Sequence, residues 1–468
     1  MRSLVDLPIS LDRDSSRPLA AQLAGRLREA MLGGTPAPGE RLPSTRGLAA
    51  QLGVSRTVVT EAYQQLYAEG WLDGRHGSGT FVAEFSPPPS PPRSRPAPRH
   101  RGEAHCDRPP RPGAVIDLTP GAPWVRDYDR AAWKRAWRRA AELPPGDDPD
   151  PYGLPHLREL LAVHLRRTRA VAVGAENILV TRGTGNGLDL VALALLGHGA
   201  RAGVEDPGYR VARNVFAARG AQVVPCPADQ DGVVVDGLPG DLAVLYTTPA
   251  HQYPLGGRLP IPRRERLLAW ARRTGAVVVE DDYDAEFRYD VAPLPALYGL
   301  DPSQVVLLGT LSKSLAPDVG LGWLVGPPEL LARVAELREE VGDRTSGPVQ
   351  QAVATLLADG DLDRHLRRMR LEYARRRAVV VETLGGLCRL RGDTAGLHVL
   401  AELPEHVVED VVAAAHEAGV LLDTTLRHHH AAPRVHGLVI GYGSASLADV
   451  GKGCRIVAEL IAPAVGRR

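Results

Sequence analysis

The chain has 468 residues, which is too long for one ordinary domain and predicts two or three. It is 44% hydrophobic and 24% charged with a formal net charge of +1, so it can bury sizeable cores and lacks an overall basic bias. The first residues have no apolar run typical of a signal peptide, no stretch of 18 apolar residues occurs, and the four cysteines are scattered. We therefore expect a cytoplasmic protein without a membrane span.

Residues 1–83 have the pattern of a compact helical domain. Apolar residues recur every four positions in its first part and predict one buried helix face: Leu19, Leu23, Leu27 and Met31. A second helix is expected to open at Ser44 or Thr45, and a third to begin at the N-cap Ser55 and end at Gly70. The segment WLDGRHGSGTFV that follows indicates a β-hairpin.

The second and third helices, joined by a short turn with a glycine, form a helix-turn-helix. The N-terminus of the third helix would offer amide donors to phosphate and side chains to the major groove. The side chains expected to contact DNA are Arg46, Ser55, Arg56, Thr57, Thr60 and, in the hairpin, Arg75. A helix pair used only for packing is the alternative, but the hairpin and the linker beyond it favour DNA binding.

The stretch PGERLPSTRGLAAQLGVSRTVVTEAYQQLYAEGWLDGRHGSGTFV, residues 38–82, resembles the winged-helix domain of the GntR family of bacterial repressors nearly end to end. The resemblance implies sequence-specific binding of a dimer to double-stranded operator DNA. Residues 84–113 follow, with ten prolines in thirty residues, and predict an extended, semi-rigid linker.

From residue 114 to the end, helical stretches alternate with short apolar runs such as NILV, LAVLY, AVVVED and VVLLGT. Continuous apolar strands between helices indicate a parallel sheet covered on both faces. We expect a large α/β lobe over about 114–330 and a smaller α+β lobe over about 331–468.

Lys313 is one of only three lysines in a chain that otherwise uses arginine for positive charge. Only lysine offers a primary amine that can be deprotonated and form an imine. Lys313 follows the strand VVLLGT, next to the hydroxyls of Thr310 and Ser312. These residues predict a covalently held cofactor with an anionic group.

A second glycine-rich segment, TRGTGNGLDL, follows a strand and opens a helix. The amides of Thr184 and Gly185 would therefore hold an anion at the helix N-terminus. A tight turn without a ligand is the alternative interpretation.

The segment VVVEDDYDAEFRY places acids at the carboxyl end of a strand, where ligands bind in open α/β sheets. Asp281 could pair with a protonated pyridine nitrogen, and Tyr283 could reach the oxygen on the same ring. A metal site is the competing interpretation of these acids, but no histidine or cysteine stands at ligand spacing, so no metal is expected. Tyr209 is placed to stack on a ring. His251 and Gln252 follow another strand, and Gln252 is expected to contact the cofactor.

The motifs EDPGY, TPAHQYPLG, VVVEDDYDAEFRY and GTLSKSLAP, together with the winged helix, resemble the MocR/GabR group, in which a GntR winged helix is fused to a fold-type I aminotransferase-like domain. The resemblance implies that pyridoxal 5'-phosphate (PLP) forms an aldimine with Lys313, and that Asp281 faces the pyridine nitrogen. It also implies that Tyr283 faces the ring oxygen, that Tyr209 stacks on the ring, and that the chain forms a head-to-tail homodimer.

Two positions depart from the pattern of that group. Gly320 stands where an arginine usually binds the cofactor phosphate, and Asp148 stands where a tyrosine commonly helps to hold it. Tyr152, close to Asp148, is a potential replacement. Losing one arginine–phosphate contact costs about 1.5–3 kcal/mol, so weaker PLP binding is expected.

Three functions agree with these motifs. The first is a transcription regulator that senses an amine, an amino acid or PLP itself through Lys313; the second is a regulator whose degenerate site serves as a dimer scaffold or takes another ligand. The third is a working aminotransferase, which would need an arginine for the substrate carboxylate. Arg434 is the candidate for that effector or substrate contact, with Arg210 and Arg427 as rivals.

Overall fold

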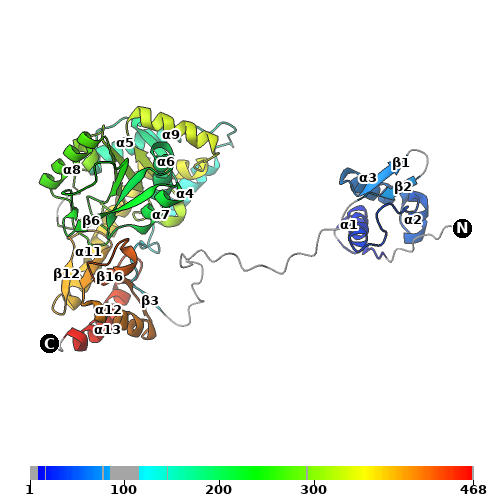
Figure 1. Cartoon of the computed structure of the whole chain (residues 1–468). Coiled ribbons are helices and arrows are strands. Elements are labelled where there is room, and N and C mark those ends of the chain that lie inside the picture. Colours follow the sequence, from blue (N-terminus) through cyan, green and yellow to red (C-terminus); the bar gives the residue numbers. More distant parts are fainter. Residues whose placement is uncertain are drawn as a thin grey trace. The chain divides into compact units, whose positions relative to one another are not determined.

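The computed structural model describes residues 9–15, 17–75, 79–84, 115–144, 146–290 and 294–465. The chain divides into two compact units, Met1–Arg108 and Pro109–Arg468, which Figure 1 colours along the sequence. Apart from Glu84, the expected linker 84–113 lies outside the described residues, so the predicted domain boundaries stay predictions.

The described part of the first unit contains three helices and a hairpin, as the sequence predicts. They are α1 (Leu19–Leu32), α2 (Thr45–Leu52), α3 (Arg56–Ala68), β1 (Leu72–Arg75) and β2 (Gly79–Val82). Ser44 and Ser55 cap α2 and α3, because each side chain accepts a hydrogen bond from a backbone N–H of the first turn. The hairpin turn, residues 76–78, and the Arg75 side chain lie outside the described part of the chain.

The core of this unit is the face that the four-residue spacing predicts. Its buried members include Leu23, Leu27, Met31, Leu48, Val59, Ala62 and Leu66. The chain before α2 also joins the hairpin, since the Leu42 amide donates to the Thr80 carbonyl and the Val82 amide to the Glu40 carbonyl, both at 2.9 Å. This pairing holds the hairpin against the helices.

The second unit is built on an eight-stranded sheet with the order β4-β11-β10-β9-β8-β5-β6-β7. The strands are β4 (Ile178–Thr181), β5 (Arg201–Asp206), β6 (Gln222–Asp229), β7 (Gly232–Val233), β8 (Val244–Thr247), β9 (Val277–Asp282), β10 (Val305–Thr310) and β11 (Gly322–Val325). Five neighbouring strands are parallel to one another: β10, β9, β8, β5 and β6. The strands on either side of them, β11 and β7, pair antiparallel with their neighbours. Their carboxyl ends therefore meet at one edge of the sheet.

Helices cover both faces of this sheet (Figure 1). They are α4 (Arg130–Ala141), α5 (Pro155–Arg169), α6 (Thr184–Leu195), α7 (Arg210–Ala218), α8 (Ile261–Thr274), α9 (Pro328–Glu340) and α10 (Gly347–Ala358). Successive strand residues enter different cores: Val278 and Leu307 belong to one, Val279 and Leu308 to the other. This two-sided burial explains why the strands are continuous apolar runs.

A smaller sheet, of order β12-β13-β16-β15, forms the second lobe, drawn in orange to red in Figure 1. Its elements are β12 (Arg389–Arg391), β13 (His398–Glu402), β15 (Asp423–Thr424), β16 (Gly437–Gly441), α11 (Asp361–Leu384), α12 (Glu405–Glu417) and α13 (Leu447–Val465). None of the helices in the described ranges is long and apolar enough to cross a membrane.

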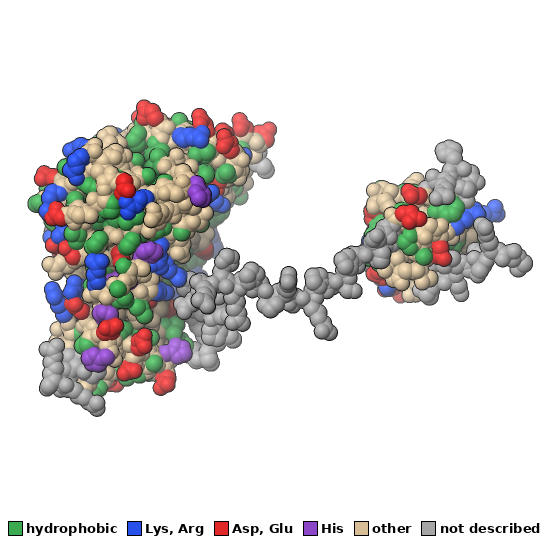
Figure 2. Space-filling model, viewed as in Figure 1, with side chains coloured by type: hydrophobic (Ala, Val, Ile, Leu, Met, Phe, Trp, Pro, Cys, Tyr) green, Lys and Arg blue, Asp and Glu red, His purple; other side chains and the backbone are tan. Residues whose placement is uncertain are grey.

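The expected division into lobes near residue 330 stays a prediction, and some contacts cross it. Helices α9 and α10 pack on α6 and on α4 and α5, so they lie with the large sheet. Conversely β3 (Ile116–Asp117), placed by sequence in the large lobe, pairs parallel with β14 (Val420–Leu421) of the small lobe. Local patterns predict elements but do not reveal these long-range pairings. On the face of this unit seen in Figure 2, basic and acidic side chains are interspersed, in keeping with the low net charge.

Candidate functional site

The predicted DNA-contacting residues lie at the start of α3 and at the start of α2. Ser55, Arg56 and Thr57 are exposed, and the Arg56 Nε donates to Thr45 Oγ1 at 3.3 Å. Thr60 is half-buried, and its hydroxyl donates to the Arg56 carbonyl at 2.9 Å, so its polar group is engaged within the helix. Arg46 is exposed on α2.

The second candidate site lies where β8, β9 and β10 end, because parallel strands bring these ends together. Asp281 is at the end of β9, and only 3% of its surface is exposed. Its Oδ2 accepts a hydrogen bond from the Tyr246 hydroxyl at 2.7 Å, whereas its Oδ1 is buried and has no partner among the described residues. Burial raises the pKa of Asp281 to about 7, although the bond from Tyr246 opposes this shift.

Lys313 follows β10 and points toward the segment before α4, where its Nζ donates to the Gly121 carbonyl. Burial lowers the pKa of the Lys313 amine, while the nearby carboxylates of Asp284 and Asp281 oppose that shift. A lowered pKa increases the share of neutral amine, which is the nucleophilic form. Sequence reasoning did not identify Gly121 or Tyr246 as neighbours of the site.

An open cradle of amides and hydroxyls lies next to the lysine. Gly183 caps α6 with φ 97°, and no side chain caps the amides of Thr184 and Gly185. A Cβ on Gly183 would lie 3.5 Å from Thr310 Oγ1 and 3.8 Å from Ser312 Oγ, so the helix N-terminus and both hydroxyls face one small space. The Thr310 hydroxyl also bonds to Ser312 at 3.0 Å. This arrangement suits an anion.

The two departures from the aminotransferase pattern are not deeply buried. Gly320 is left-handed with φ 57°, and a Cβ there would meet only the Asp318 carbonyl, at 4.0 Å. Asp148 is exposed. Tyr152 is half-buried against the core on one face of the sheet, and the Arg158 guanidinium lies over its ring at 5.4 Å.

Aromatic rings join Tyr209 to Asp281. The Tyr209 ring stacks on that of Tyr246 at 6.4 Å, and Tyr246 bonds to the Asp281 carboxylate. Gln252 is different, because its amide nitrogen donates to the Pro207 and Tyr253 carbonyls at 2.9 and 2.8 Å. The same nitrogen lies 3.2 Å from the Glu205 carboxylate. The Gln252 side chain therefore links its own loop to the end of β5, an arrangement that its position after a strand does not reveal.

The three candidate arginines have different surroundings. Arg434 is exposed and has no ion pair or hydrogen bond within the described ranges. Arg427 forms an ion pair with Asp423. Arg210 is half-buried at the start of α7, next to Tyr209. The structure does not bring the three guanidinium groups into one contact.

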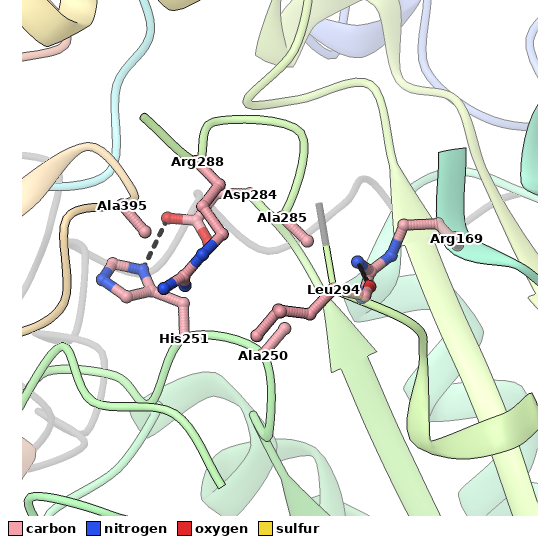
Figure 3. A pocket seen from close by; sticks show the side chains of 8 residues that line it. All are labelled: Arg169, Ala250, His251, Asp284, Ala285, Arg288, Leu294 and Ala395. Atoms are coloured by element: carbon pink, nitrogen blue, oxygen red, sulfur yellow. Dashed lines mark hydrogen bonds and ion pairs between the residues drawn. The ribbon is translucent and has the colours of Figure 1, made fainter. Parts of the chain in front are cut away.

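Tyr283 contacts a buried histidine–aspartate pair. Its hydroxyl lies 3.0 Å from both the Nδ1 and the carbonyl oxygen of His251, and Asp284 Oδ2 lies 2.9 Å from the same Nδ1. Figure 3 shows this pair beside a narrow cavity that is also lined by Arg169 and Arg288. His398 of β13 completes a group of three potential metal ligands whose atoms lie within 4.8 Å of one another. The spacing of histidines and cysteines in the sequence does not reveal this group, because its members come from three distant segments.

Comparisons with known proteins agree with this architecture. Residues 19–82 match the gntR family of bacterial regulatory proteins, and residues 131–423 match aminotransferase class I and II. The HTH-type pyridoxine biosynthesis transcriptional regulator PdxR of Corynebacterium glutamicum is 38% identical, over 94% of this chain and 95% of its own length. The probable rhizopine catabolism regulatory protein MocR of Rhizobium meliloti is 34% identical, over 92% and 91%.

Among solved structures, LysN, the alpha-aminoadipate aminotransferase of Thermus thermophilus complexed with N-(5'-phosphopyridoxyl)-L-leucine, is 26% identical. Its TM-score is 0.68, and the match covers 74% of this chain and 92% of that chain. Enzymes of this kind use PLP in general, and the full-length relatives are regulators. The chain therefore belongs to the MocR-type transcription regulators, in which a GntR-family DNA-binding domain is joined to an aminotransferase class I and II domain.

Proposed function

We propose that the protein is a PLP-responsive transcription regulator, which binds operator DNA through its first unit and PLP through Lys313 of its second. The observation that carries this proposal is the Asp281 Oδ1 atom, buried and without a partner in the described chain. An unpaired buried carboxylate oxygen is costly, and a protonated pyridine nitrogen would satisfy it and keep the carboxylate ionised.

The surrounding residues fit the other parts of the same cofactor. Lys313 would hold its aldehyde carbon, Tyr209 would stack on the ring, and Tyr283 would contact the ring oxygen. The phosphate would be held by the cradle of Thr184, Gly185, Thr310 and Ser312. When bound, PLP supplies an electrophilic carbon that exchanges reversibly between amines.

We propose PLP itself as the effector. The cradle consists of amides and hydroxyls, and Gly320 stands where an arginine would place a guanidinium group. The phosphate would therefore be bound less tightly, by the about 1.5–3 kcal/mol that an arginine contact contributes. A weaker hold allows occupancy to follow the free concentration of the cofactor. The 38% identical relative is named as a regulator of pyridoxine biosynthesis, and a regulator of that kind would need to respond to the concentration of the free cofactor. A head-to-tail homodimer on operator DNA completes this proposal.

Absorbance spectroscopy tests the cofactor assignment. Purified protein incubated with PLP should gain a visible band that borohydride reduction abolishes, with the pyridoxyl mass located on Lys313. Lys313→Ala should lack the band, whereas Lys452→Ala, which removes an exposed lysine, should keep it. A wild-type protein that stays colourless would instead favour the scaffold function.

Two further measurements separate the remaining alternatives. Operator duplexes selected from a random pool should bind with an affinity that depends on PLP in the wild type and not in Lys313→Ala. Sustained keto-acid-dependent conversion of an amino acid would favour a working aminotransferase. Such an enzyme needs an arginine for the substrate carboxylate, and the exposed Arg434 has no ion-pair partner in the described ranges.

A further inference from the structure

The second unit contains a strap, residues 116–127, whose two ends are bonded to the small lobe. At the first end, β3 pairs parallel with β14. At the second end, the Trp124 amide donates to the Tyr373 hydroxyl of α11 at 2.7 Å. The Arg376 guanidinium of the same helix lies over the Trp124 ring at 4.4 Å, close enough for a cation–π contact. The small lobe therefore holds the strap at both ends.

The middle of the strap packs against two glycines at the end of β16 and just beyond it. A Cβ on Gly441 would lie 2.4 Å from the Thr119 carbonyl oxygen, and a Cβ on Gly443 would lie 2.3 Å from the Ala122 carbonyl oxygen. Both distances are too short for a real side chain, so the close approach depends on glycine. The Gly441 amide also donates to the Leu118 carbonyl at 2.7 Å. The small lobe therefore supports the middle of the strap as well as its ends.

Between these two glycine contacts the strap is tied to the cofactor lysine of the large lobe. Lys313, which follows β10, donates from its Nζ to the Gly121 carbonyl. Gly121 has φ 99°, which favours glycine, and a Cβ there would lie 3.6 Å from Lys313 Nζ. The amine that we assign to PLP thus contacts a segment that the small lobe holds from the opposite side.

This bond and the capture of PLP need the same nitrogen of Lys313. The Gly121 carbonyl only accepts, so the bond requires hydrogen on Nζ. When the neutral amine bonds to the aldehyde carbon, both of its hydrogens leave with the aldehyde oxygen as water. A proton that the nitrogen regains lies in the plane of the new C=N bond, so its direction is set by the cofactor. Lys313 therefore holds either the strap or the cofactor.

We propose that this exchange is the switch of the regulator: capture of PLP releases the strap from Lys313, and the strap passes the change to the DNA-binding unit. This inference rests on the proposed function. The strap lies in the first described segment of the second unit, and residues 84–113, the predicted linker, precede it in the chain. A shift of the strap therefore reaches the linker along the chain itself. The free amine favours the strap position in this structure and the captured amine does not, which is the differential interaction that a switch requires.

Two substitutions of the lysine test the proposal in full-length protein without PLP. Lys313→Met is nearly as long as lysine but cannot donate to Gly121, so its affinity for selected operator DNA should match that of PLP-loaded wild type. Lys313→Arg still offers a donor but forms no imine, so it should match PLP-free wild type. Wild type with and without PLP should differ by about fivefold or more, the lower end of usual coupling between sites. Equal operator affinities in the two variants would overturn the proposal.

Hydrogen exchange gives a readout in the strap itself. The amides of Gly121 and Ala122 should exchange several-fold faster in Lys313→Met than in Lys313→Arg, because the tie to the large lobe is lost. Equal exchange rates in the strap, together with different operator affinities, would mean that the signal leaves the site by another route and would overturn the proposal.

Gly443→Ala displaces the strap without changing the lysine and serves where a lysine variant does not fold. Its Cβ would meet the Ala122 carbonyl, so the strap must shift, and operator affinity should depend less on PLP than in wild type while the visible band with PLP remains. An unchanged dependence on PLP would contradict the proposal. A wild-type protein with no visible band overturns the proposed function, whereas a visible band with equal operator affinities in the lysine variants overturns this inference alone.

Discussion

At the scale of single residues, the Asp281 carboxylate links the candidate site to the stability of the second unit. Burial raises its pKa from the ordinary 3.8 to about 7. The folded protein therefore holds a proton on Asp281 across a pH range in which the unfolded chain has lost it. Linkage then requires that the free energy of unfolding falls as pH rises through this window. Above about pH 7 the contribution of Asp281 to the free energy of unfolding no longer changes with pH.

Asp281→Asn should remove this part of the pH dependence in PLP-free protein. Urea unfolding at about pH 5 and about pH 8 should show a smaller loss of stability at high pH in Asp281→Asn than in wild type. The exposed Asp148→Asn is the control and should behave as wild type. Equal pH dependence in all three proteins would contradict the raised pKa.

Gly320→Arg tests the missing guanidinium. An arginine there should strengthen PLP binding by about ten- to a hundredfold relative to Gly320→Ala, the size of a charge-assisted hydrogen bond. The alanine variant is the right reference, because φ 57° at this position costs any side chain about 1 kcal/mol. Equilibrium dialysis measures both affinities, and equal values would show that a guanidinium at this position does not reach the phosphate.

The sequence predicts those site residues that follow strands and misses those that come from elsewhere. Asp281, Thr310 and Lys313 can be proposed from the sequence because parallel strands bring their carboxyl ends together. Gly121, which accepts the bond from Lys313, lies 192 residues away in sequence, and no local pattern marks it. The bonds of Gln252 to Glu205 and Pro207 are equally invisible, since these partners lie more than 40 residues away in sequence.

At the scale of elements, caps and apolar spacing predict α1 to α3 well, because these helices are amphipathic, α2 and α3 begin after a capping serine, and α1 and α2 end at a glycine. The strands of the large sheet are predicted for a similar reason, since each is a short apolar run. The division into lobes stays a prediction. It depends on pairings such as β3 with β14, which involve short strands without a strong pattern of their own.

The exposed start of α3 leads to a prediction for DNA binding. Arg56→Ala should weaken binding to a selected operator by about 1–3 kcal/mol and relax its sequence preference. Arg26→Ala is the matched control, because Arg26 is an exposed arginine of α1 paired with Glu29. A gel-shift titration against operator and mutated operator measures both effects. Equal losses in the two variants would argue for general charge rather than a recognition helix.

At the scale of the whole molecule, each compact unit has its own hydrophobic core. Calorimetry should therefore resolve two unfolding transitions. PLP should raise only the transition of Pro109–Arg468, by roughly 3 °C or more at a hundredfold excess over Kd. Selected operator DNA should raise only the other. A single transition that both ligands shift together would contradict independent unfolding.

The scarcity of lysine has an analytical consequence. Lys134 and Lys452 are exposed, whereas Lys313 is half-buried and its amine is bonded to the Gly121 carbonyl. An amine-reactive reagent should therefore modify Lys134 and Lys452 whatever the state of the site, and should modify Lys313 only in molecules whose cofactor has dissociated. Because arginine does not react, the number of labels on the purified protein, beyond those on Lys134, Lys452 and any free α-amine, would distinguish empty from occupied molecules by intact mass.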